Sequence, residues 1–84
     1  MEHRQYLVII EGGQNGENYF AYSSDVEGCV ATGDTLGEVI DNMQSALAFH
    51  LEGMLLNGEE IPEGSAGTTV YLTVTVPEIK RQLA

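Results

Sequence analysis

The residue types that most often carry catalysis are scarce in this sequence. Its only imidazoles are His3 and His50, and its only thiol is Cys29. Two histidines so placed give no basis for a serine–histidine–acid arrangement. No lysine or arginine stands near Cys29 to activate it, so we interpret Cys29 as a small buried apolar residue and His50 as a packing residue at the core boundary. We predict no catalytic residue, no cofactor and no enzymatic activity.

Carboxylates are the one abundant reactive group, and clustered carboxylates can hold Mg²⁺ in nucleases. Five of them lie close together in the sequence: Asp25, Glu27, Asp34, Glu38 and Asp41. A nuclease must also attract phosphate, yet the nearest cation along the chain is Arg4. We therefore interpret these acids as solvated surface and helix capping, with no metal site. A residual metal-dependent nuclease is kept as the second alternative function.

The charge balance points to a protein partner. The 84 residues include 3 Lys+Arg and 13 Asp+Glu, a formal net charge of −10. Nucleic-acid binding depends on cations that neutralise phosphates, so direct nucleic-acid binding is not expected. A polyanion instead suits a basic protein. With one cysteine, no apolar run long enough to span a bilayer and no signal-peptide pattern at its start, the chain is expected to be cytoplasmic, with no membrane partner.

The length is that of one domain, 1–84, and its first half is typical of a β-meander. Strands are predicted at about residues 5–11, 18–24 and 28–32, where β-branched and aromatic residues are separated by glycine-containing turns. The continuous apolar run Tyr6–Ile10 is typical of a central strand or one covered on both faces. Gly28 and Gly33 are expected to supply backbone freedom at the two ends of the third strand.

A helix is predicted over about residues 35–57. Apolar residues recur there at three- and four-residue steps from Leu36 to Leu55. Thr35 and Glu38 fit a capping box, in which Thr35 accepts from the Glu38 amide and Glu38 reaches back, while Asp34 is the rival N-cap. Asn57-Gly58 would end the helix.

A fourth strand is predicted at about residues 69–76, followed by a short tail, 77–84. Val70, Leu72, Val74 and Val76 alternate there with polar or aromatic residues. A helix between strands three and four must cross back over the sheet, which predicts an α+β fold of mixed sheet order 3-2-1-4 with one helix on one face. The uncovered face predicts a homo-oligomer, a dimer or tetramer. The candidate self-association residues are Tyr71, Thr73 and Thr75.

The stretch from Ser24 to Glu38 resembles the signature of the HicB antitoxin-like family, and the similarity extends over about residues 5–76. That signature reads approximately Pro-Asp-x-Pro-Gly-Cys followed by Gly-Asp-Thr-x-x-Glu-Ala. The matching residues are Asp25, Gly28, Cys29, Gly33, Asp34, Thr35 and Glu38. Ser24 and Glu27 stand where the family usually has prolines. Longer members append a DNA-binding domain that this sequence does not contain, so the chain resembles a short member.

The resemblance implies a degraded ribonuclease-H-like fold of order β-β-β-α-β. It also implies a role: members of this family pair with HicA, a small basic mRNA-cleaving toxin, and cover its RNA-binding surface. The candidate contacts for such a partner are Tyr19, Tyr22, Asp25 and Glu27. A stand-alone HicB-like homo-oligomeric module of unassigned role is the first alternative.

Overall fold

The first half of the chain forms a three-stranded antiparallel meander. The computed structural model describes residues 2–65 and 67–78. Its strands are β1 (Val8–Gly12), β2 (Tyr19–Ser23) and β3 (Val30–Gly33), in the sheet order β1-β2-β3. Val8 pairs with Ser23 and Gly12 with Tyr19, while Tyr19 also pairs with Gly33 across the other ladder. The turn between β1 and β2 uses the positive φ of Gly12, Gly13, Asn15 and Gly16.

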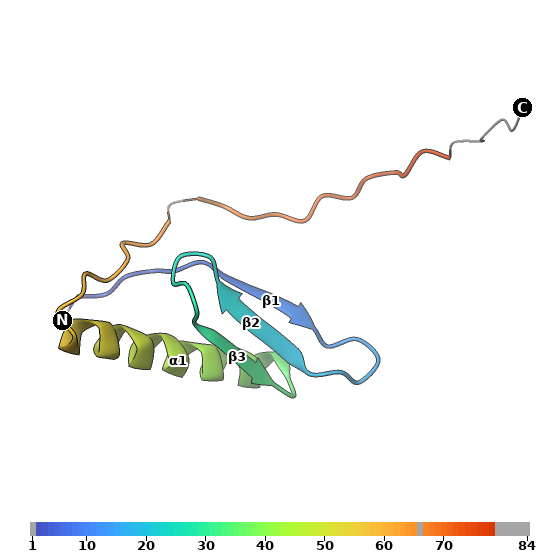
Figure 1. Cartoon of the computed structure of the whole chain (residues 1–84). Coiled ribbons are helices and arrows are strands. Elements are labelled where there is room, and N and C mark those ends of the chain that lie inside the picture. The colour runs from blue at the N-terminus through green and yellow to red at the C-terminus, as the bar shows by residue number, and fades with distance from the viewer. Residues whose placement is uncertain (1, 66, 79–84) are drawn as a thin grey trace, which may run out of the picture.

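One helix, α1 (Leu36–Leu56), follows β3 and packs on one face of the sheet (Figure 1). Thr35 is its N-cap, because the side-chain oxygen accepts a hydrogen bond from the Glu38 N–H at 3.1 Å. Asn57 is the C-cap. The α+β class and the order of three strands followed by a helix are therefore confirmed.

The core lies between α1 and the side of the sheet that the helix covers. Its buried members come from β2, the turn that follows β2, and α1: Ala21, Val26, Cys29, Val39 and Met43. Tyr6, Val8 and Ile10 pack against them from the first strand and its approach. Since side chains alternate along a strand, Leu7 and Ile9 lie on the opposite face, which no helix covers.

Two expectations about the sheet are not confirmed in this structure. β1 is an edge strand, and β2 occupies the centre. One face of the apolar run in β1 meets the core, and the other, with the half-buried Leu7 and Ile9, lies on the face of the sheet that no helix covers. The fourth strand predicted at residues 69–76 is not formed, because the segment pairs with no other strand and leaves the body of the protein (Figure 1). Residues 67–78 are called the arm below.

Candidate functional site

Asp25 ties together three segments that are distant in the sequence. Its Oδ2 accepts hydrogen bonds from the Leu7 N–H at 2.8 Å, the Ser65 N–H at 3.1 Å and the Ser65 hydroxyl at 3.0 Å. These bonds join the start of β1, the turn after β2 and the segment that follows α1. The hydrogen bond from Leu7, aided by those from Ser65, lowers the pKa of Asp25 although partial burial opposes this shift.

Ser23 completes the same network from the end of β2. Its hydroxyl donates to the Leu7 carbonyl at 2.7 Å and accepts from the N–H groups of Asp25 at 3.1 Å and Val26 at 3.2 Å. The side chain is buried, so these bonds satisfy polar groups that water does not reach. Sequence reasoning missed Ser23 and Ser65, although a serine two residues before an aspartate in a turn is a known local hydrogen-bonding pattern.

Most of the other signature residues also serve the fold. Gly28 has φ +83°, a conformation that favours glycine, and Cys29 is buried, which raises the pKa of its thiol. Gly33 does not have a positive φ. Its lack of a side chain matters because a Cβ there would lie 2.5 Å from the Val39 nitrogen. Asp34 is exposed, and Thr35 rather than Asp34 caps the helix.

The predicted partner contacts lie in three different environments. Tyr19 is half-buried and packs against the core on the helix side of the sheet. Tyr22 lies on the opposite face beside Phe20, with ring centroids 5.9 Å apart. Glu27 is exposed and lines a hollow of about 500 Å³ together with Phe49 and Glu59. Asp25 is held by the hydrogen bonds described above, so these four residues do not form one patch.

A second group of exposed residues lies on the side of α1 that faces away from the sheet. Phe49 is 80% exposed and Leu56 79% exposed. They are seven residues apart and therefore lie on one side of the helix, with Glu52 between them. The acids Glu38 and Asp41 continue this side toward the helix start. We call these five residues the outer helix face. The signal for it in the sequence is that Phe49 and Leu56 fall outside the apolar repeat of the helix.

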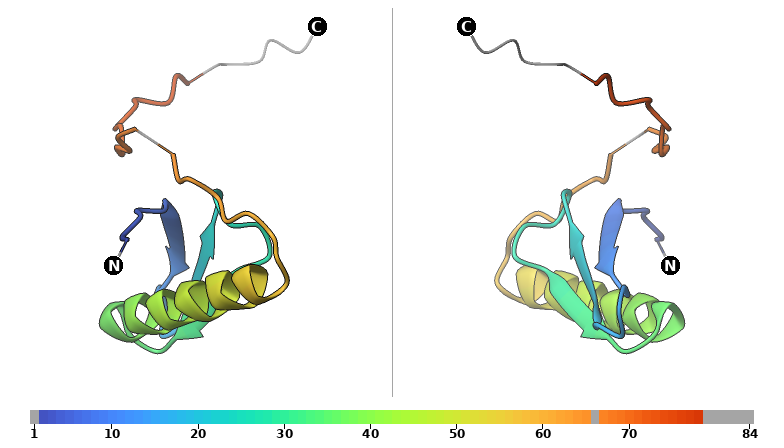
Figure 2. Two further views of the ribbon diagram at one scale, coloured as in Figure 1. Left: turned by 90° about the vertical axis from the view of Figure 1, so that its left-hand side faces the viewer. Right: turned by 90° about the vertical axis from the view of Figure 1, so that its right-hand side faces the viewer.

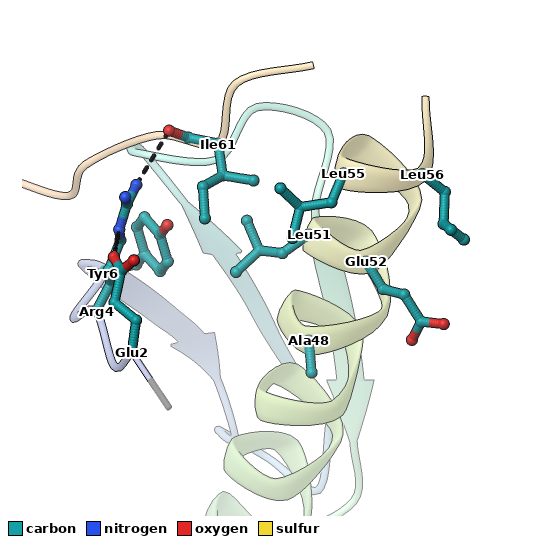
Figure 3. Close-up of a pocket in the computed structure, with 9 residues that line it drawn as sticks. All are labelled: Glu2, Arg4, Tyr6, Ala48, Leu51, Glu52, Leu55, Leu56 and Ile61. Carbon is teal, nitrogen blue, oxygen red and sulfur yellow. Dashed lines mark hydrogen bonds and ion pairs between the residues drawn. The ribbon is translucent and has the colours of Figure 1, made fainter. Parts of the chain in front are cut away.

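A groove runs along the C-terminal half of α1 beside the outer helix face. Its volume is about 500 Å³, and Leu51, Leu55 and Ile61 form its apolar floor while Glu2 and Glu52 lie at its rim (Figure 3). Arg4 lies across the groove from α1. It pairs with Glu2 and donates hydrogen bonds to the Ile61 and Pro62 carbonyls at 3.2 and 3.0 Å. The only described lysine or arginine side chain is thus already engaged within the chain.

Comparison with known proteins gives a family for this arrangement. Residues 6–80 match the model of the HicB-like antitoxin of bacterial toxin–antitoxin systems. The chain belongs to this family. The match covers the signature turn, α1 and the whole arm, so the HicB-like region is nearly the whole sequence.

Two relatives of the HicB-like chain are found among curated proteins. An uncharacterised 14.9 kDa protein from the rep–hol intergenic region of Haemophilus phage HP1 is 42% identical over 60 residues. That alignment covers 71% of this chain but only 44% of the phage protein. A UPF0150 protein of Synechocystis is 29% identical over 58 residues, which cover 69% of this chain and 72% of that protein. No solved structure gives a significant match.

The HicB-like fold brings no catalytic set together in the residues that the structure describes. Within residues 2–65 and 67–78, no three histidine, cysteine or acidic side chains converge as metal ligands would. His3 is exposed, and His50 is half-buried at the boundary of the core. Over the same residues, no helix combines the length and the apolar character that crossing a bilayer requires.

Tyr71, Thr73 and Thr75 are all exposed in the arm. They lie on one side of an extended segment. Their role in self-association stays a prediction.

Proposed function

We propose that this HicB-like chain is an antitoxin that binds a small basic HicA-type mRNA-cleaving toxin and covers its RNA-binding surface. The observation that carries the proposal is the outer helix face, on which two exposed apolar side chains stand among three acids. No lysine or arginine occurs in the sequence between Arg4 and Lys80, so nothing on α1 offsets these charges. Family membership supplies the role of antitoxin, and the face supplies a surface that suits a cationic partner.

The two kinds of side chain on this face would do different work. Burial of Phe49 and Leu56 against a partner would contribute about 1.5–3 kcal/mol for each side chain. The acids around them would speed the encounter with a basic protein and take the place of the RNA phosphates that the toxin otherwise binds. Glu27 and Glu59 border Phe49 from the other side and would extend the acidic rim.

The C-terminal end of α1 adds a second reason to expect a cationic partner. Carbonyl groups at a helix C-terminus carry partial negative charge and are stabilised by cations. The last turn of α1 holds no basic residue, and Glu52 and Glu59 lie near it. The chain therefore leaves this end electronegative, and a lysine or arginine of a bound toxin would compensate it.

The finer features of the proposal follow the family. The fold would be ribonuclease-H-like, with the arm as a fourth strand beside β1 in the order 3-2-1-4. The pair would act in the cytoplasm, where mRNA is found. The chain would act by binding, without chemistry of its own.

Co-expression tests the proposal directly. The basic product of the adjacent reading frame should arrest growth alone and be harmless, and co-purify, when this chain is present. If no such gene exists, or if its product remains toxic and unbound beside this chain, the stand-alone module replaces the antitoxin.

A matched pair of variants tests which surface is used. Phe49→Ser should weaken toxin binding at least about tenfold, because it removes one buried anchor worth more than 1.4 kcal/mol. Tyr22→Ser, on the far face of the sheet, should bind nearly as well as the natural chain. Titration calorimetry measures both, and circular dichroism checks that both fold. If Tyr22→Ser weakens binding and Phe49→Ser does not, the toxin binds the sheet face around Tyr22 instead of the outer helix face.

A further inference from the structure

The arm is an apolar segment that stays exposed along its length, although its first residues, 67–71, line hollows beside residues 5–10 of the same chain. Its large apolar side chains Val70, Tyr71, Leu72, Val74 and Val76 are between 72% and 97% exposed. Figure 2 shows that the arm rises from the side of the sheet opposite α1 and continues away from the body. So much exposed apolar surface on one short segment marks an interaction site.

The arm has the pattern of a strand but lacks a strand to pair with. Val70, Leu72, Val74 and Val76 fall on one side and Tyr71, Thr73 and Thr75 on the other. Among the described residues, no hydrogen bond joins positions 67–78 to the rest of the chain. The last anchored residue before the arm is Ser65, which Asp25 holds beside the start of β1.

The outer edge of β1 offers the hydrogen bonds that such a strand needs. Leu7 directs its N–H to Asp25 and its carbonyl to Ser23, both on the β2 side. Backbone groups of successive strand residues point to alternate sides, so those of Val8 and Ile10 point away from β2. No described segment pairs with this edge, and an unpaired edge is a template for another strand.

The core is also incomplete beside this edge. A hollow of about 300 Å³ opens between β1 and α1, and Val8, Ile10, Ile40, Met43 and Leu47 line most of it. Ile40 is exposed there, although it is an apolar residue on the sheet side of the helix. A strand placed along β1 would direct every second side chain into this hollow.

We propose that the arm of one copy of this chain pairs along β1 of a second copy and fills the hollow between that β1 and its helix. Residues 69–76 would span about 26 Å as a strand, close to the roughly 23 Å from Tyr6 to Gly12. The arm leaves its own sheet on the side away from α1, and none of its residues lines the hollow between its own β1 and α1. Reciprocal exchange in a two-fold dimer would pair both edges and cover both hollows.

The charge distribution permits two copies to meet at this place. Each chain carries a net charge of −10, which opposes association over most of its surface. Residues 64–77 contain no charged residue, and neither do residues 5–10. The exchanged contact would therefore join neutral segments and keep the outer helix face free. It is independent of the toxin and stands or falls separately from the antitoxin proposal.

Light scattering is the first test. The purified chain should have twice the 9.1 kDa mass of one copy at micromolar concentration. Val74→Asp places a charge on the side of the arm that enters the hollow, and it should yield monomers. Thr75→Asp places the same charge on the other side of the arm and should leave the dimer intact. A monomeric natural chain, or a dimer broken by Thr75→Asp but not by Val74→Asp, would overturn the proposal.

Disulfide trapping distinguishes exchange from pairing within one chain. In a Cys29→Ala background, a Val8→Cys chain and a Leu72→Cys chain with different tags are co-expressed and oxidised, with Val70→Cys and Val74→Cys as neighbouring registers. Exchange predicts a cross-linked species that carries both tags. Phe49→Cys, on the outer helix face, replaces Val8→Cys in the control and should give no such species. A further chain carries Val8→Cys and Leu72→Cys together. If a disulfide forms within this chain and none forms between the two separate chains, the arm closes on its own β1 and the proposal is wrong.

Discussion

Asp25 shows how one carboxylate can belong to a functional signature and still serve the fold. Sequence reasoning placed it both among the signature residues and among the candidate partner contacts. The structure uses its side chain to hold Leu7 and Ser65. Such bonds to an ionised acceptor are stronger than bonds between neutral groups. A residue engaged in this way is poorly available to a partner, whereas Glu27, two positions later, is exposed.

Replacement of Asp25 by Asn should therefore change how stability depends on pH. The pKa of Asp25 is lower in the folded chain than the value of about 3.9 expected when unfolded, so the unfolded state takes up the proton first as pH falls. The stabilisation is present at neutral pH and is lost as pH falls from about 4 through the folded-state pKa. Asp25→Asn should melt at a lower temperature at pH 7 and lose less stability on acidification.

Thermal melts from pH 7 to pH 2 measure the effect of Asp25→Asn. Glu27→Gln is the control, since it removes the same charge from the same turn without any of these hydrogen bonds. Parallel pH profiles for Asp25→Asn and the natural chain would contradict the role given to Asp25.

At the scale of elements, the junction between β3 and α1 depends on close approach. Gly33 ends β3 against the backbone of Val39, and the Asn42 side chain donates to the Thr32 carbonyl at 2.8 Å. The helix thus begins with its first two turns fixed to the strand before it. Gly33 and Thr35, two signature residues at this junction, are explained by packing and capping.

Gly33→Ala should destabilise the protein by about 1–3 kcal/mol, because the added methyl group would overlap the backbone of α1 and force the strand and helix apart. Gly37→Ala is the matched control. A Cβ at Gly37 meets nothing within 4 Å, and alanine in a helix is favoured by about 1 kcal/mol over glycine. Denaturant unfolding should move in opposite directions for the two variants. An unchanged midpoint for Gly33→Ala would contradict this packing.

At the scale of the whole molecule, the protein separates a charged part from a neutral one. The outer helix face and the helix end concentrate acids, while residues 64–77 and 5–10 carry none. The proposed toxin contact and the proposed exchange of arms therefore rest on different forces. One is aided by long-range attraction, and the other depends on apolar burial and backbone pairing.

Salt should distinguish these two contacts. Raising ionic strength from 0.1 M to 1 M shortens the screening length from about 10 Å to about 3 Å. The association rate with a basic toxin should fall at least about tenfold, while the dissociation rate changes much less. The arm-exchanged dimer should not weaken, because its contact is uncharged. Stopped-flow kinetics and light scattering measure these effects, and a salt-independent association rate would argue against steering by the acidic face.

The sequence by itself determined what depends on neighbours along the chain. The apolar period and the Thr35 cap determined α1, and glycines with positive φ determined the turn between β1 and β2. The excess of acids determined that the surface charge is negative, and the spacing of the signature residues from Asp25 to Glu38 indicated the family. The helix and the turn are readable because residues within about four positions of each other decide them.

Only the tertiary structure decided which distant groups meet. Asp25 finds partners 18 and 40 residues away, and Gly33 is required by the approach of Val39 rather than by its φ. The alternation in residues 69–76 correctly indicates an extended segment, but a strand exists only where another backbone accepts its hydrogen bonds. Sequence pattern reports the conformation that a segment prefers, and the presence or absence of that neighbour is decided in three dimensions.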